Sequence, residues 1–192
     1  MDACKANTEY VLKNNQFDKG IDIKFKELRQ ELQLPKDLAL IESYDISHHA
    51  GKNAVAGCVA YTKQGKASDL YRTYNITKAN WGNDIGSMIE LIERRFSGIK
   101  ARELPGLIIV DGGKTHLKKV LQTLESCDIK DVNVISISKG IRRKATFDTI
   151  HFPNGESVNI NRTSISHQFI QEIRDETHRY SITMQKKKMR KT

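Results

Sequence analysis

The stretch LIIVDGGKTHLKKVLQTL, residues 107–124, places an acid two residues before a Gly-Lys-Thr sequence of the kind found in phosphate-binding loops. A loop of the form G-x-x-x-x-G-K-[ST] would need a glycine at position 108. Ile108 stands there, inside an apolar run, and Asp111 would repel an anion unless a metal lay between them. The stretch is therefore not a phosphate-binding loop, and Asp111 becomes the candidate functional residue.

The surroundings of Asp111 suggest a metal site at the end of a strand. Residues 107–110 predict a buried strand, and the apolar spacing of residues 114–124 predicts an amphipathic helix. In open α/β sheets, ligands bind at the carboxyl ends of strands, and an exposed carboxylate there suits a divalent cation. The alternative is that Asp111 only caps the helix, and this stretch alone does not decide between the two.

A second acid, Asp45, lies inside the strand-like sequence LIESYDISHH. A carboxylate in an apolar strand raises the free energy of the fold unless it is paired or bound to metal. That Asp45 instead caps the turn at Ser47-His48 is the weaker interpretation. Asp45 is therefore the second candidate metal ligand.

The third candidate segment is IRDETHRY, residues 173–180. On a helix, Asp175 and His178 are three residues apart and share a face, and Arg174 and His178 are four apart. An isolated helical histidine is commonly surface or core filler, but this one lies beside an apolar run and among basic residues. His178 is therefore retained as a candidate.

The elements that would position these residues follow from the apolar patterning. Three strands with short connections form an antiparallel meander, and helices and further strands follow. In chain order, we expect strands at 39–46, 54–61 and 69–76, a helix at 84–95, the strand at 107–110, the helix at 114–124, a strand at 132–137, a hairpin or flap near 146–152 and 157–160, and a helix from 166 past 183.

This is the order of an RNase H-like mixed sheet, an α/β fold in which three antiparallel strands precede parallel ones and helices flank the sheet. In such a sheet the first and fourth strands are neighbours, so Asp45 should stand beside Asp111. Residues 1–32 are expected to form an N-terminal helical extension. Residues 33–192 are expected to form the RNase H-like domain with a basic tail.

The composition fits a protein of the cytoplasm with a polyanionic partner. The net charge is +9, and residues 174–192 carry seven Lys or Arg against two acids. A second basic cluster comprises Lys139, Arg142, Arg143 and Lys144. Such clusters favour nucleic acid, because neutralised phosphates release counterions. No apolar run is long enough to span a membrane, and the three cysteines lack disulfide or metal-ligand spacing, which indicates reduced thiols.

The motifs together resemble the UvrC excision-nuclease family. IESYDISHHAGKNAVAGCVAY, DLYRTYNI, LPGLIIVDGGKTHL, VISISKGIRRK and IRDETHRYSITMQKKKMRK occur in that family's order across residues 33–191. The match is to its C-terminal endonuclease domain. The resemblance implies an RNase H-like fold that cuts damaged double-stranded DNA on the 5′ side of a lesion during nucleotide excision repair.

The resemblance also implies the residues of the site. Asp45, Asp111 and His178 would form a triad for Mg²⁺ or Mn²⁺, and Asp84 would be a further catalytic acid. Where relatives have two adjacent acids, this chain has Asn83-Asp84, so only Asp84 is carried over. The residues expected to hold DNA phosphates are Lys114, Lys139, Arg142, Arg143, Lys144 and Arg179, contacts that carry no sequence information.

Three further expectations complete the sequence-based hypothesis. The full-length relatives act with UvrB, but the segment that contacts UvrB is expected to be absent here. His178 should point towards Asp45 and Asp111, with Arg179 turned away and Asp175 paired to a basic neighbour. The alternative function is an RNase H-like domain that only binds nucleic acid, or one that cuts RNA or a DNA junction.

Overall fold

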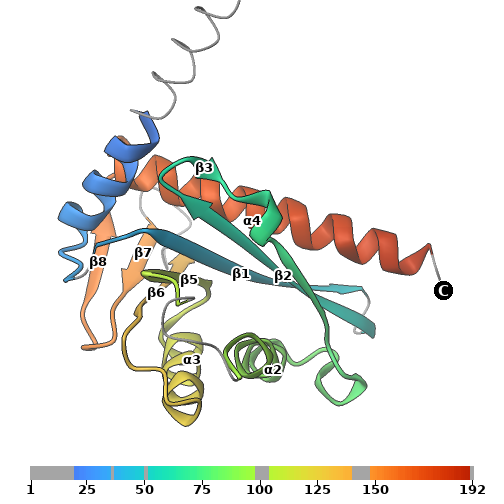
Figure 1. The fold of residues 1–192 in the computed structure, drawn as a ribbon. Coiled ribbons are helices and arrows are strands. Elements are labelled where there is room, and N and C mark those ends of the chain that lie inside the picture. The colour runs from blue at the N-terminus through green and yellow to red at the C-terminus, as the bar shows by residue number, and fades with distance from the viewer. Residues whose placement is uncertain (1–19, 36, 50–51, 98–103, 140–147, 191–192) are drawn as a thin grey trace, which may run out of the picture.

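The structure, a computed structural model, describes residues 20–35, 37–49, 52–97, 104–139 and 148–190. The strands in this part of the chain form a single mixed sheet in the order β3-β2-β1-β5-β6-β7-β8, with β4 pairing β2 (Figure 1). Their bounds are β1 Leu40–His49, β2 Lys52–Thr62, β3 Gly65–Lys66, β4 Arg72–Asn75, β5 Leu107–Asp111, β6 Asn133–Lys139, β7 Asp148–His151 and β8 Ser157–Ile160.

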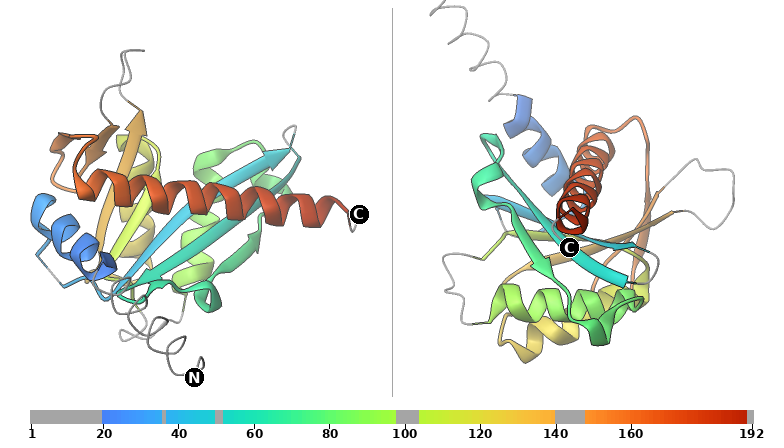
Figure 2. Two further views of the ribbon diagram at one scale, coloured as in Figure 1. Left: turned by 90° about the horizontal axis from the view of Figure 1, so that it is seen from above. Right: turned by 90° about the vertical axis from the view of Figure 1, so that its right-hand side faces the viewer.

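Helices cover both faces of this sheet. Residues 20–31 and the long helix α4 lie on one face, and α2 and α3 lie on the other (Figure 2). Two short 3₁₀ helices flank β4. The bounds are α2 Asp84–Phe96, α3 Lys114–Ser126, α4 Ile165–Met189, η1 Ser68–Leu70 and η2 Lys78–Asn80.

Local sequence explains where the two helices that border the site begin. The side-chain oxygen of Asn83 accepts the backbone N–H of Gly86 at 2.9 Å and caps α2. The hydroxyl of Ser164 accepts the N–H of His167 at 3.1 Å and caps α4. Each contact satisfies a donor that the first turn of a helix leaves unpaired.

The core has two layers, one on each side of the sheet. Under α4, the Phe169 ring packs at a tilt against Phe25 and edge-to-face against Tyr61, with ring centroids 5.4 and 5.8 Å apart. Under α2 and α3, the buried side chains include Tyr44 and Val110. Because β5 is central and both of its faces are covered, its first four residues are all buried, and this explains the continuous apolar run.

The RNase H-like fold expected from the sequence is confirmed, with two local differences. The expected third strand, 69–76, begins within η1, and only β4 in its second half pairs with β2; a separate two-residue strand, β3, precedes it and also pairs with β2. The β7–β8 hairpin is part of the sheet: β7 pairs antiparallel with β6, and β8 forms the edge. Of the expected N-terminal extension, residues 1–19 lie outside the described residues, and Phe25 and Leu28 pack into the core under α4.

Candidate active site

Asp45 and Asp111 are neighbours at the carboxyl ends of two parallel strands. The β1–β5 ladder ends at the pair Tyr44–Val110, and each acid is the next residue on its strand. Because side chains alternate along a strand and Tyr44 and Val110 face α2 and α3, both carboxylates face α4. The fold thus brings together two acids that are 66 positions apart in the sequence.

Helix α4 supplies the groups that contact Asp45. His178 Nδ1 lies 3.3 Å from Asp45 Oδ2, and the Ser181 hydroxyl donates a hydrogen bond to the same oxygen. Asp45 is 16% exposed, whereas His178 is 68% exposed. The histidine therefore stands at the open rim of the site, and the aspartate stands at its base.

Arg174, one turn before His178 on α4, contacts Asp111. Its Nη2 donates to Asp111 Oδ1 at 2.9 Å, and its Nη1 donates to Asp148 Oδ2 at 3.2 Å. Gln171 also donates to Asp148 Oδ2. The i, i+4 spacing of Arg174 and His178 thus places one basic side chain at each of the two aspartates.

A glycine permits α4 to lie this close to the sheet. Gly57 of β2 is the register partner of Asp45. A Cβ added at Gly57 would lie 3.0 Å from the Cβ and 3.1 Å from the Cα of Ser181. Because there is no side chain at Gly57, the backbone of α4 can approach β2 and bring the Ser181 hydroxyl to Asp45.

Asp84 does not join this group. It lies in the first turn of α2, where its Oδ1 is 2.6 Å from Nε2 of His48. Ser47 turns towards α4, since its hydroxyl donates to Gln185, and His48 turns towards α2. No hydrogen bond or ion pair between described residues links Asp84 to Asp45, Asp111 or His178.

The structure describes only some of the residues expected to bind DNA. Nζ of Lys114 donates to the backbone carbonyl of Gly155 at 3.0 Å. Lys139 is the last residue of β6 and pairs in register with Asp148. Arg142, Arg143 and Lys144 lie outside the described residues.

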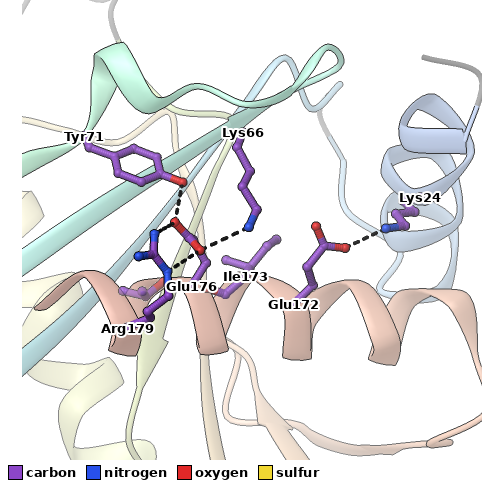
Figure 3. Close-up of polar contacts among 8 residues, drawn as sticks. Lys24, Lys66, Tyr71, Glu172, Ile173, Glu176 and Arg179 are labelled. Carbon is purple, nitrogen blue, oxygen red and sulfur yellow. Dashed lines mark hydrogen bonds and ion pairs between the residues drawn. The ribbon is translucent and has the colours of Figure 1, made fainter. Parts of the chain in front are cut away.

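Arg179 extends from α4 towards Glu176, near Tyr71, as Figure 3 shows. It binds both carboxylate oxygens of Glu176, at 3.0 and 2.6 Å, and Lys66 and Tyr71 bind the same carboxylate at 3.1 and 3.2 Å. Hydrogen bonds from Arg179 and then Lys66 lower the pKa of Glu176 to about 2. This cluster fixes α4 to the β3–β4 region, so that the helix holds its position over the two aspartates.

Asp175 is exposed on α4, and the structure shows no hydrogen bond or ion pair between it and any other described residue. The basic partner expected for it is thus not found in this part of the chain. Asp175 also makes no contact with Asp45 or Asp111.

Sequence reasoning assigned no role to Arg174, Ser181, Gly57 or Asp148. The one available signal was the four-residue spacing of Arg174 and His178, which placed both on one helix face. Gly57 and Ser181 act through a close approach of helix to strand that depends on tertiary packing.

The two aspartates and His178 fit a hard divalent cation by their chemistry. Carboxylate oxygens are preferred ligands of Mg²⁺ and Mn²⁺, and imidazole can join them. Asp111 is 53% exposed and already attracts one cation, the Arg174 guanidinium. In the described part of the chain, no three His, Cys, Asp or Glu side chains are close enough to form a complete ligand set, so His178 and the aspartates would close further around an ion.

Comparison with known proteins agrees with the fold. Residues 29–182 match the family described as the UvrC RNAse H endonuclease domain. The UvrABC system protein C of Legionella pneumophila (strain Lens) is 36% identical over 186 residues, covering 96% of this chain and 29% of that protein. The same protein of Coxiella burnetii (strain CbuK_Q154) is 32% identical, covering 95% and 30%.

The fold is thus that of an RNase H-like nuclease domain. The chain belongs to the UvrC RNase H endonuclease domain family. It spans about 30% of the length of the relatives it matches. Among solved structures, the catalytic domain of human Endonuclease V is similar with a TM-score of 0.42 and 13% identity, covering 82% of this chain and 79% of that one. None of the described helices is long and apolar enough to cross a membrane.

Proposed function

We propose that this chain is a metal-dependent endonuclease that cuts damaged double-stranded DNA on the 5′ side of a lesion in nucleotide excision repair. The observation that carries the proposal is the adjacency of Asp45 and Asp111 on one face of the sheet, beneath His178. Family membership supports the reaction class, which is phosphodiester hydrolysis. The proposed location is the cytoplasm, and in a full-length protein the proposed partner is UvrB.

In this proposal, Asp45 and Asp111 hold Mg²⁺ or Mn²⁺. When bound, such an ion stabilises developing negative charge and lowers the pKa of its water. Ser181 fixes the orientation of the Asp45 carboxylate through its hydrogen bond. Because Nδ1 of His178 faces Asp45 and the ring is exposed, Nε2 is free to move a proton to or from water or the leaving oxygen.

The role proposed for Asp84 is indirect. Its pairing with His48 joins the first turn of α2 to the end of β1, three residues beyond Asp45. Asp84 would therefore act on the position of the end of β1 rather than as a ligand of the same ion.

The DNA would be held by the basic residues around this edge of the sheet. Lys114 can exchange its neutral partner among the described residues, the Gly155 carbonyl, for a phosphate. Lys139, Arg142, Arg143 and Lys144 are proposed to bind further phosphates, whereas Arg179 is held by the Glu176 carboxylate on another face of α4. Neutralising Arg142, Arg143 and Lys144 should flatten the salt dependence of DNA binding, because each lost phosphate contact lowers the slope by about 0.9.

The test measures Mn²⁺ binding by electron paramagnetic resonance and incision of a duplex that carries one bulky lesion and a 5′ label. Asp45→Asn and Asp111→Asn keep the side-chain shape but remove a ligand charge, so each should lose Mn²⁺ binding and incision. Asp175→Asn is the matched control, because it removes an exposed carboxylate from α4. Mn²⁺ binding and incision at the wild-type level by either site variant would refute the proposal.

The alternative substrates are tested in the same assay. An RNA duplex and a four-way DNA junction of the same sequence replace the damaged DNA. Faster cleavage of either one than of damaged DNA would favour the alternative function, in which the same site cuts RNA or a DNA junction. Retained nucleic-acid binding without cleavage of any substrate would favour a binding domain.

A further inference from the structure

Arg174 bridges two carboxylates that come from different strands. Its Nη2 contacts Asp111 at the end of β5, and its Nη1 contacts Asp148 at the start of β7, at 2.9 and 3.2 Å. Different nitrogens make the two contacts, so the planar guanidinium is held at both edges. With an exposed fraction of 13%, the Arg174 side chain has little freedom to leave this position.

The two ends of the bridge are not equivalent. Asp148 is 14% exposed, also accepts a hydrogen bond from Gln171, and lies 3.4 Å from His167 Nε2. Asp111 is 53% exposed, and Arg174 is its one ion-pair partner among the described residues. Asp148 is therefore the anchor of the guanidinium, and Asp111 is the partner that solvent or an ion can reach.

The two aspartates of the candidate site also differ from each other. The partners of Asp45 are a neutral hydroxyl, from Ser181, and the imidazole of His178. The partner of Asp111 is a permanent cation, because a guanidinium does not deprotonate in proteins. Among the described residues, a divalent ion that approaches the pair of aspartates therefore meets a permanent cation paired with Asp111 but none paired with Asp45.

We propose that Arg174 is the built-in counter-cation of the metal site. It holds the Asp111 carboxylate in place when no metal is bound, and it competes with the incoming ion for that carboxylate. Asp148 sets the strength of this competition, because it draws the guanidinium towards the interior. Arg174 is thus a positioning residue that tunes metal affinity, an inference that rests on the proposed function of Asp45 and Asp111 as metal ligands.

The proposal predicts opposite effects for two substitutions that break the same ion-pair network. Arg174→Gln removes the competing charge and should tighten Mn²⁺ binding on the order of tenfold, the effect of one unit charge beside a divalent ion at a half-exposed site. Asp148→Asn leaves the guanidinium with Asp111 as its one charged partner among the described residues and should weaken Mn²⁺ binding roughly threefold or more. In the Arg174→Gln background, Asp148→Asn should have a smaller effect.

Mn²⁺ affinity of the 192-residue chain is measured by electron paramagnetic resonance, and circular dichroism checks folding. Arg174→Lys is the charge-preserving control and should stay within about threefold of wild type, since Coulomb competition depends on the charge. A structural role for Arg174 instead predicts that Arg174→Gln and Asp148→Asn weaken binding alike. That outcome, or unchanged affinity in Arg174→Gln, would overturn the inference.

The result also separates this inference from the proposed function. Suppose that wild type binds Mn²⁺, that Asp45→Asn loses this binding, and that Arg174→Gln leaves it unchanged. That result would refute the counter-cation role of Arg174 alone. No Mn²⁺ binding by wild type or by Arg174→Gln would refute the metal site and the counter-cation together. If Arg174→Gln does not fold, the test rests on Asp148→Asn. Tighter or unchanged Mn²⁺ binding by Asp148→Asn would refute the inference. Weaker Mn²⁺ binding by Asp148→Asn, with Arg174→Lys close to wild type, would support it.

Discussion

Gly57→Ala tests whether close contact between α4 and β2 builds the candidate site. The new Cβ would meet the Cβ and Cα of Ser181 at 3.0 and 3.1 Å, and a ring carbon of Tyr180 at 3.2 Å. Ordinary carbon contacts are about 3.5–4.0 Å, so α4 must move outward by roughly half an ångström or more. Neither Ser181 contact is the flexible end of a long side chain, so the helix backbone itself has to shift.

We expect two measurable consequences of this shift. Overpacking costs about 1–3 kcal/mol, and replacing glycine in a strand returns about 0.5–1 kcal/mol, so the free energy of unfolding should fall by about 0.5–2 kcal/mol. The His178–Asp45 contact is already 3.3 Å long and should break as the helix moves outward. Metal affinity and incision should therefore fall by about tenfold or more, because misplacement of about 1 Å is sufficient for such losses.

Urea unfolding at pH 7 and Mn²⁺ titration provide the measurements. Gly20→Ala is the matched control: a Cβ there meets nothing within 4 Å, and the residue lies at the start of the described N-terminal helix. It should leave both quantities unchanged or raise stability slightly. If Gly57→Ala unfolds at the wild-type urea concentration and binds Mn²⁺ normally, then close packing of α4 is not what positions His178.

Three other residues give further predictions. Glu176→Gln should lower the free energy of unfolding at pH 7 by about 1–2 kcal/mol, discounted because its basic partners are half exposed, whereas Asp175→Asn should change it little. The pKa of Glu176 is lowered from 4.5 to about 2, so its contribution to the free energy of unfolding is complete above pH 4.5 and should disappear as the pH falls towards 2. In urea titrations at acid pH, the free energies of unfolding of wild type and Glu176→Gln should therefore converge over that range. Ser181→Ala should cost about 1 kcal/mol and weaken Mn²⁺ binding through Asp45. Phe169→Ala should cost about 3–5 kcal/mol in urea unfolding, and a value below 1 would contradict its place in the core.

The adjacency of the two aspartates could be predicted from the sequence because it follows from strand order and side-chain alternation. The order of elements places the first strand beside the fourth, and both acids follow apolar residues at strand ends. The division of the expected third strand could not be predicted in this way. Its first half, around Ser68–Leu70, forms a 3₁₀ helix whose conformation depends on local hydrogen bonds rather than on apolar spacing.

The partners of the aspartates were harder to foresee, because they depend on where α4 crosses the sheet. Sequence spacing placed Arg174 and His178 on one helix face, but it gave no information about which strand each would meet. Arg179 lies five residues after Arg174 on a different face, and its partner Glu176 is three residues away from it. A basic residue in a motif can therefore serve the fold, and only the packed helix distinguishes it from a residue that faces the substrate.

The way α4 crosses β1 and β5 has a consequence for insertions and deletions. Four residues of helix advance about 6 Å along the axis, close to the 4.7–4.9 Å that separates neighbouring strands. One helical turn therefore delivers one side chain to each strand, Arg174 to β5 and His178 to β1. A single-residue deletion between Arg174 and His178 would rotate the rest of α4 by about 100°, so no change of length should be tolerated in this turn of the helix. The loop between β7 and β8 around Gly155, in contrast, can vary in length without moving either aspartate.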